Sequence, residues 1–115
     1  MSVARISADD LVRKSCAPAR KGTPSLTLEQ AREYVAAVPG WQLSPDTKQI
    51  SREWTFKDFL EAMAFVNRVA VVAETEQHHP DIAIHWNRVT LVLWTHSIGG
   101  LHENDFVMAA KLDRA

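Results

Sequence analysis

The apolar residues of this chain repeat first at the helical period and then at the strand period, and this succession occurs twice. Apolar side chains that recur every three or four residues predict an amphipathic helix, whereas strict alternation predicts a strand with one buried face. Pro39-Gly40 separates the first helical segment from the strands that follow it. The predicted order is a helix over 27–38, strands over 41–43 and 50–56, a helix over 58–78, strands over 82–86 and 89–96, and a short helix that begins near 103.

Four strands in two hairpins, with helices before, between and after them, predict an α+β domain with the order αββαββα. The simplest packing is a four-stranded antiparallel sheet with the helices packed on one face. The chain has 115 residues, of which 46% are apolar and 23% charged, as in one ordinary globular domain. We assign this domain to residues 26–115. Residues 1–25 lack sustained periodicity, and we expect them to form an extended or partly mobile N-terminal arm.

The charge and hydropathy of the chain argue against two classes of partner. Its formal net charge of -1, with acidic and basic residues interspersed, lacks the single-signed surface that direct nucleic-acid binding needs. The longest largely apolar run, Val89 to Trp94, is far shorter than the roughly 20 residues of a membrane-spanning helix. Cys16 is the only cysteine and the sequence shows no signal-peptide pattern, so we expect a cytoplasmic protein that binds a small molecule.

Three of the five histidines lie near the ends of predicted elements, where their side chains can line a cleft. His78 and His79 precede Pro80, which cannot continue a helix. His96 lies at the end of an apolar strand, shortly before Gly99-Gly100. Because imidazole donates and accepts protons near neutral pH, this set predicts acid/base catalysis by His78, His79 and His96.

Two carboxylates and one aromatic residue are candidates to support these histidines. On a helix, Glu74 lies one turn from His78 on the same face, so it either orients that imidazole or stays solvated. Asp105 suits the helix dipole as a first-turn residue, and its side chain can also face the site. Trp86 is either a core residue or the wall of a pocket for a flat heterocycle.

Three histidines and a carboxylate also raise the possibility of a zinc site. Adjacent residues such as His78 and His79 rarely converge on one ion, and neither a His-Glu-x-x-His motif nor a cysteine pair occurs. We therefore predict no metal and no cofactor. The other two histidines lack a comparable setting: we expect His85 to face solvent and His102 to start the last helix.

The long predicted helix over 58–78 is apolar over more of its circumference than a one-sided surface helix needs. Its predicted core stripe consists of Phe59, Ala62, Met63, Val66, Val69, Ala70 and Ala73. Four apolar residues fall outside this stripe: Leu60, Phe65, Val71 and Val72. We therefore predict that these four contact a second copy of the chain.

The polar motif as a whole resembles the signature of the pterin-4a-carbinolamine dehydratases, which are also called dimerisation cofactors of a homeodomain transcription factor. The residues that carry the resemblance are Glu74-x-x-x-His78-His79-Pro80, Trp86, Thr95-His96 and Asp105. The resemblance implies an αββαββα fold, a homodimer or homotetramer, and dehydration of 4a-hydroxytetrahydrobiopterin to quinonoid dihydropterin and water. That reaction recycles the cofactor of aromatic amino-acid hydroxylases, which implies a functional link to phenylalanine hydroxylase.

The resemblance also implies a role for each residue of the motif. By the family pattern, the pterin site is formed by His78, His79 and His96, with Glu74, Thr95 and Asp105 in support. Trp86 stands where many relatives have Tyr, which keeps an aromatic wall. The same fold also serves as a non-catalytic binding or assembly protein, in transcription-factor dimerisation or RuBisCO assembly. The intact histidine set favours the enzyme over that alternative.

Overall fold

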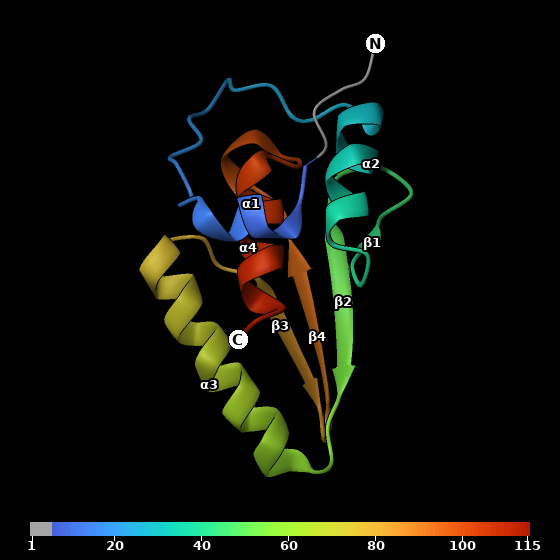
Figure 1. Ribbon diagram of the computed structural model, residues 1–115, viewed down its shortest axis with the longest axis vertical. Coiled ribbons are helices and arrows are strands. Elements are labelled where there is room, and N and C mark those ends of the chain that lie inside the picture. The colour runs from blue at the N-terminus through green and yellow to red at the C-terminus, as the bar shows by residue number, and fades with distance from the viewer. Residues whose placement is uncertain (1–5) are drawn as a thin grey trace.

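The computed structural model describes residues 6–115, which form a four-stranded sheet, four α-helices and one 3-10 turn (Figure 1). In chain order the elements are α1 (Ala8–Arg13), α2 (Leu28–Ala37), β1 (Gln42–Leu43), β2 (Ile50–Thr55), α3 (Phe59–Glu76), β3 (Asp81–His85), β4 (Arg88–Leu93), the 3-10 turn η1 (His96–Ile98) and α4 (Glu103–Leu112). The predicted order αββαββα is confirmed from α2 onward. None of the helices in the described residues has the length and apolar character needed to cross a membrane.

The sheet has the strand order β1-β2-β4-β3, and all neighbouring strands are antiparallel. Its central pair joins strands from the two hairpins, with Ile50 opposite Leu93. Along β4, Val89, Leu91 and Leu93 are fully buried and alternate with half-buried residues. This period-two burial is that of a sheet covered by helices on one face, as predicted, with its other face more open.

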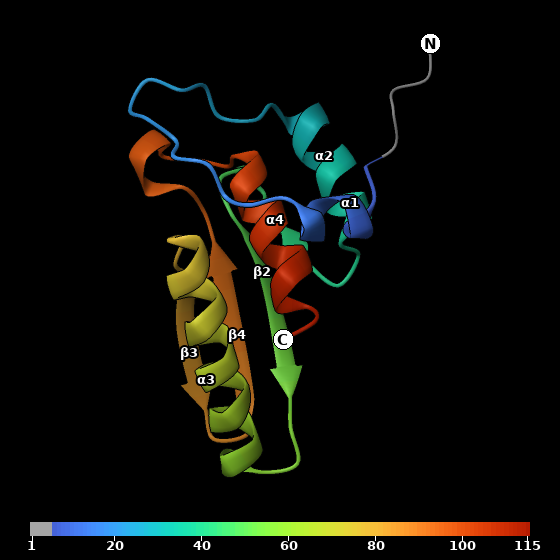
Figure 2. The same cartoon turned by 60° about the vertical axis from the view of Figure 1, so that its left-hand side comes forward.

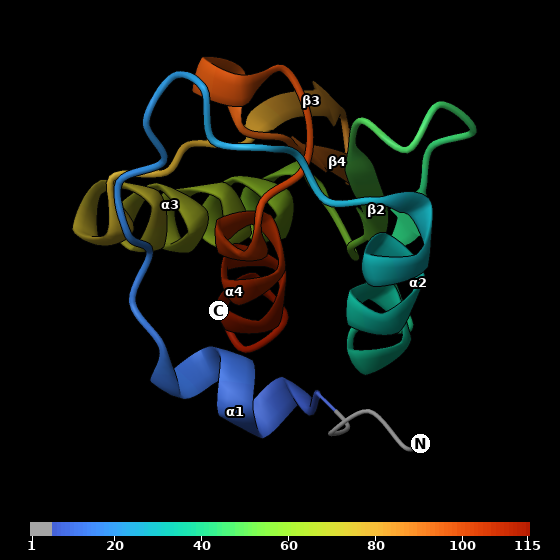
Figure 3. The same cartoon turned by 90° about the horizontal axis from the view of Figure 1, so that it is seen from above.

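α4 lies in the centre of the helical layer, with α2 and α3 on either side and α1 across its outer surface (Figures 2 and 3). Its residues 104–110 are all buried. Phe106 stacks on Tyr34 of α2 with ring centroids 5.0 Å apart. Because this helix is buried around its circumference, its polar side chains Asn104 and Asp105 need partners within the protein.

The N-terminal arm departs from its prediction over residues 8–13, which form α1 in place of an extended chain. Ser7 caps this helix by accepting a hydrogen bond from the backbone N–H of Asp10, and Leu11 is buried in the core. Six residues are too few for a detectable helical repeat, which explains why periodicity missed α1. Residues 14–25 contain no helix or strand, and residues 1–5 of the predicted arm lie outside the described part of the chain.

The buried face of α3 is rotated relative to the predicted stripe. Its buried residues are Ala62, Phe65, Val69 and Ala73. Phe65 packs against Trp54 and Phe56, with ring centroids 4.9 and 5.1 Å apart. By contrast, Phe59 is 47% exposed and Ala70 is exposed. The prediction that Phe65 faces a second subunit is therefore wrong, because this aromatic cluster draws its ring into the core.

Candidate active site

α3 ends because Gln77 adopts a left-handed backbone conformation with a φ of 53°. The backbone N–H groups of Gln77 and His78 both bind the carbonyl of Ala73, which closes the last turn. α3 thus ends at Glu76, two residues before the predicted end, and His78 and His79 lie just beyond it, near the helix end as predicted. The expected helical pairing of Glu74 with His78 does not form, because the chain reverses at Gln77 before it reaches His78.

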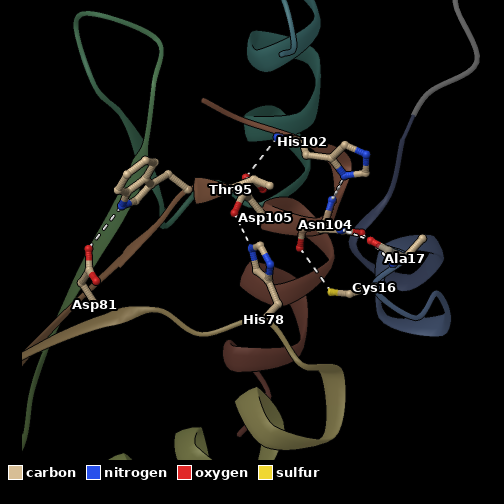
Figure 4. Close-up of polar contacts among 9 residues, drawn as sticks. Cys16, Ala17, His78, Asp81, Thr95, His102, Asn104 and Asp105 are labelled. Atoms are coloured by element: carbon tan, nitrogen blue, oxygen red, sulfur yellow. Dashed lines mark hydrogen bonds and ion pairs between the residues drawn. The ribbon is translucent and has the colours of Figure 1, made fainter. Parts of the chain in front are cut away.

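His78 instead faces Asp105, and its Nε2 lies 2.6 Å from the carboxylate Oδ1 (Figure 4). Asp105 is fully buried. Its Oδ2 accepts a hydrogen bond from the Thr95 hydroxyl at 2.9 Å and another from the His102 backbone N–H at 3.0 Å. Since an ionised carboxylate can only accept hydrogen bonds, Nε2 of His78 carries a proton in this pair. Charge-assisted bonds of this kind hold the ring in one orientation.

Asp105 reaches this position because it is the third residue of α4 and belongs to the capping box of that helix. His102 is the N-cap, as predicted, and its Nδ1 accepts the backbone N–H of Asn104. In return, Asp105 accepts the backbone N–H of His102. One carboxylate therefore fixes both the start of α4 and the ring of His78.

His79 pairs with Glu74 at the rim of the site. Its Nε2 lies 2.5 Å from Glu74 Oε2, and the two side chains are 55% and 72% exposed. Solvent weakens an ion pair this exposed, so it contributes little to stability. The contact can still bias the orientation of the His79 ring.

His96 opens η1 soon after β4, and its ring lies against Trp94 with centroids 3.8 Å apart. The indole Nε1 of Trp94 donates to Asp81 Oδ2 at 3.3 Å. Gly99 then turns the chain with a φ of 63°, a left-handed conformation that glycine adopts without steric cost. Trp94 was not among the predicted site residues. Its spacing of two residues from His96 at a strand end was the available signal, since such residues point to the same side.

The ends of α3 and β4 bring the predicted histidines to one pocket of about 390 Å³. Its lining includes His78, His79, Trp94, Thr95 and His96. Residues 16–19 of the N-terminal arm complete the wall. This volume falls within the roughly 300–1,000 Å³ that is typical of small-molecule sites. Asp105 lies behind His78, and Glu74 reaches the site through His79.

Trp86 is the one predicted site residue that the fold places elsewhere. It lies in the turn between β3 and β4, at the far end of β4 from His96, with a φ of 53° and 67% of its surface exposed. The hairpin reverses at Trp86 and Asn87, one residue earlier than predicted, and the indole therefore projects from a tight turn. Trp94 provides the aromatic wall of the pocket instead.

Cys16 is a further group with reactive chemistry at the pocket. Burial, and after it the nearby carboxylate of Glu76, raise the pKa of the Cys16 thiol to about 12. The thiol therefore stays protonated at neutral pH, where it is a poor nucleophile. Within residues 6–115, no three His, Cys, Asp or Glu side chains are arranged to hold a metal ion. The same pocket is lined by the imidazoles of His78, His79 and His96.

The family model described as pterin 4 alpha carbinolamine dehydratase matches residues 24–115 of this chain. The chain belongs to the pterin 4 alpha carbinolamine dehydratase family. This result confirms the resemblance seen in the histidine motif, and it places the chain among hydro-lyases, enzymes that remove water from their substrates.

Relatives in this dehydratase family match nearly the whole chain. A protein of Aromatoleum aromaticum is 45% identical over 105 residues, which cover 91% of this chain and 94% of the relative. A protein of Halorhodospira halophila is 44% identical over 103 residues, covering 90% and 94%. Both bear the name of the same dehydratase. A crystal structure described as a transcriptional coactivator/pterin dehydratase from Brucella melitensis is 38% identical, with a TM-score of 0.74, and covers 78% of this chain and 96% of its own.

Proposed function

We propose that this protein dehydrates 4a-hydroxytetrahydrobiopterin to quinonoid dihydropterin and water by histidine acid/base catalysis. The observation that carries the proposal is the pair of His78 with buried Asp105, at a pocket that His79 and His96 also line. A pocket of about 390 Å³ has room for a bicyclic pterin. The proposed reaction uses no metal and no organic cofactor.

The reaction consists of two proton transfers and the loss of one hydroxyl group. A base removes the proton from ring nitrogen N5, and the electron pair left on N5 forms a double bond to C4a. As this bond forms, the C4a–O bond breaks and an acid protonates the departing hydroxyl, which leaves as water. One proton is taken and one is given, so no oxidant or reductant is required. Imidazole suits both transfers, because it takes and gives protons near neutral pH.

We assign the base role to His78 and a positioning role to Asp105. The carboxylate occupies Nε2 of the ring, which leaves Nδ1 to take the N5 proton. The negative charge of Asp105 stabilises the imidazolium that then forms. Thr95 and the His102 N–H hold the carboxylate from its other side, so the ring cannot swing away without breaking a buried network.

We assign the acid role at the departing hydroxyl to His96. Its ring lies against the indole of Trp94 at an interplanar angle of 39°, and an aromatic ring also stabilises a cationic imidazolium. His79 is held by a single exposed contact to Glu74, which fits a role in binding the pterin better than a role in the chemical step.

The direct test is to generate the carbinolamine enzymatically and follow quinonoid dihydropterin with and without this protein. We expect a clear acceleration over the spontaneous dehydration. The absence of any acceleration at saturating substrate would contradict the proposed activity.

A second experiment separates imidazole catalysis from metal catalysis. We expect the dehydration rate to survive exhaustive dialysis against a chelator, because the proposed proton transfers need only histidine. Elemental analysis of the dialysed and untreated protein shows whether metal was removed. Loss of activity on chelation, with recovery on adding zinc, would instead support a metal site.

The proposed physiological role is to recycle the tetrahydropterin cofactor of aromatic amino-acid hydroxylases in the cytoplasm, with phenylalanine hydroxylase as the functional partner. A binding role is the second candidate, since the Brucella melitensis protein is described as a transcriptional coactivator as well as a pterin dehydratase. A protein that only binds others has no chemical need for a buried carboxylate beneath a pocket histidine, which favours the enzyme.

We also propose that the protein self-associates as a homodimer or homotetramer through the exposed side of α3. Leu60 and Val71 are 77% and 67% exposed, and their spacing of eleven residues places them on the same side of the helix. Ile82 and Ile84 of β3, which are 40% and 36% exposed, add to the apolar surface of the fold. Exposed apolar residues that share one side of a helix are typical of subunit contacts.

Replacing both Leu60 and Val71 with Glu should convert the oligomer to a monomer. A charge without a partner costs several kcal/mol when a contact buries it, so the subunits separate instead. Light scattering on wild type and the double variant measures the change, with Leu28→Glu on α2 as an exposed-leucine control that keeps the oligomer. A monomeric wild type would refute self-association, and an intact oligomer in the double variant would exclude this side of α3.

A further inference from the structure

The N-terminal arm runs along the pocket before the chain enters α2. After α1 it passes the C-terminal end of α3 and continues beside η1 (Figure 3). Residues 16–19, which we call the arm wall, line the pocket together with the histidines. The arm wall precedes residues 24–115, the part of the chain that the family model matches.

Polar contacts hold the arm wall at three points. At the first, Glu76 Oε1 accepts the backbone N–H of Cys16 at 2.8 Å. At the second, Asn104 pairs with the backbone of Ala17 in both directions: its Oδ1 accepts the N–H at 3.0 Å, and its Nδ2 donates to the carbonyl (Figure 4). At the third, the Ser97 hydroxyl donates to the Ala19 carbonyl at 2.6 Å.

Each anchoring side chain is a near neighbour in sequence of a group in the proposed mechanism. The neighbouring pairs are Glu76 with His78, Ser97 with His96, and Asn104 with Asp105. The arm wall is therefore attached to the same three segments that position the base, the acid and the buried carboxylate. These anchors set the location of the arm wall, so a shift of the arm wall would change the shape of the pocket that it lines.

Two of the three anchors, Asn104 and Glu76, are largely buried, whereas Ser97 is exposed. Asn104 is 5% exposed, and the Glu76 side chain is 10% exposed with its Oε2 lying 3.6 Å from Lys111 Nζ. Lys111 in turn donates to the backbone carbonyl of Val12, earlier in the arm, at 2.9 Å. Releasing the arm would leave these buried groups without partners, which is unfavourable. The arm wall is thus a fixed surface in the described structure.

We infer that the arm wall is a substrate-binding surface for the pterin, and that Asn104 and Ser97 are positioning residues that hold it there; this inference rests on the proposed function. The short side chains of Ala17, Pro18 and Ala19 line the pocket and leave room for a flat heterocycle on that side. The arm wall carries no group that exchanges protons at neutral pH, because the Cys16 thiol stays protonated. It therefore governs pterin affinity and leaves the proton transfers to the histidines.

Kinetics test the positioning residues. We expect Asn104→Ala and Ser97→Ala to raise KM by about tenfold while kcat changes less than about twofold. This pattern arises when a mutation removes binding that is equally strong for the substrate and the transition state. Ser97 is exposed, so its variant folds even where Asn104→Ala is destabilised. Ser7→Ala removes a hydrogen bond in the same arm away from the pocket and should keep the wild-type KM. Wild-type KM in the Ser97 variant, or a loss confined to kcat, would overturn the inference.

Hydrogen exchange on the wild-type protein tests the contact itself. The probe is 7,8-dihydrobiopterin, a pterin without the 4a-hydroxyl, whose binding is followed by quenching of tryptophan fluorescence. At ten times its Kd, we expect the backbone N–H groups of Cys16 and Ala17 to exchange about tenfold more slowly, while that of Asp10 is unchanged. Bound pterin without protection of the arm wall would overturn this inference alone, whereas a failure to bind pterin would overturn the proposed function with it.

Discussion

His78→Ala and His96→Ala should each lower the dehydration rate by about 10²–10⁴-fold, the usual worth of a general acid or base, while the protein remains folded. His96 is exposed, so its loss leaves the core intact. Loss of His78 also deprives buried Asp105 of one hydrogen-bond donor, so a modest fall in thermal midpoint accompanies it. Initial rates and thermal melts on the same preparations measure both effects.

The matched control is His85→Ala. His85 is exposed on β3 and does not line the pocket, so this variant should keep both the wild-type rate and the wild-type melting temperature. A general effect of removing histidine would appear in all three variants. Near-wild-type rates in both His78→Ala and His96→Ala would refute the assignment of acid and base.

Substitution of Asp105 should damage both stability and catalysis. Asp105→Ala leaves His78 Nε2, the Thr95 hydroxyl and the His102 N–H without their shared acceptor, which costs about 2–4 kcal/mol of unfolding free energy. Asp105→Asn keeps the shape of the side chain but removes the charge that stabilises the His78 imidazolium. We expect it to lower kcat by about 10²-fold with a smaller loss of stability.

A double-mutant cycle shows whether Asp105 acts through His78. If it does, Asp105→Asn in the His78→Ala background should lower kcat little further, because the group it positions is already gone. Urea titrations report the stability of each variant. Glu103→Gln, in the same turn of α4 but bound to Lys14 and Tyr34, is the control that should keep kcat. If the losses of kcat in the two single variants add fully in the double variant, Asp105 does not act through His78.

The sequence predicted the elements well where their signals were local. Apolar periodicity and the stop at Pro39-Gly40 were sufficient to predict the helices and strands, and the two hairpins were sufficient to predict the sheet. The rotation of α3 was missed because Phe65 is set by tertiary contacts with aromatic residues that are distant in the chain. Helical spacing alone cannot decide between two apolar faces when both are available.

The sequence predicted which histidines line the site better than it predicted the hydrogen-bond partner of each histidine. The histidine pair before Pro80 and the later His96 do meet at one pocket, as their positions at element ends indicated. The partner of each histidine depended on features that spacing cannot show. Because Gln77 adopts a left-handed conformation, Glu74 pairs with His79 and not with His78. The fold then places Asp105 beneath His78. Likewise, the choice between Trp86 and Trp94 depended on where the second hairpin turns.

The central position of α4 has a consequence for the order of events during synthesis. This helix follows every other element in the chain, yet the core closes around it and the site takes Asp105 from its first turn. A ribosome therefore exposes the sheet and the earlier helices before their main packing partner exists. Chaperone protection of the nascent chain would matter most in that interval, and a chain interrupted before α4 would acquire neither a closed core nor an oriented His78.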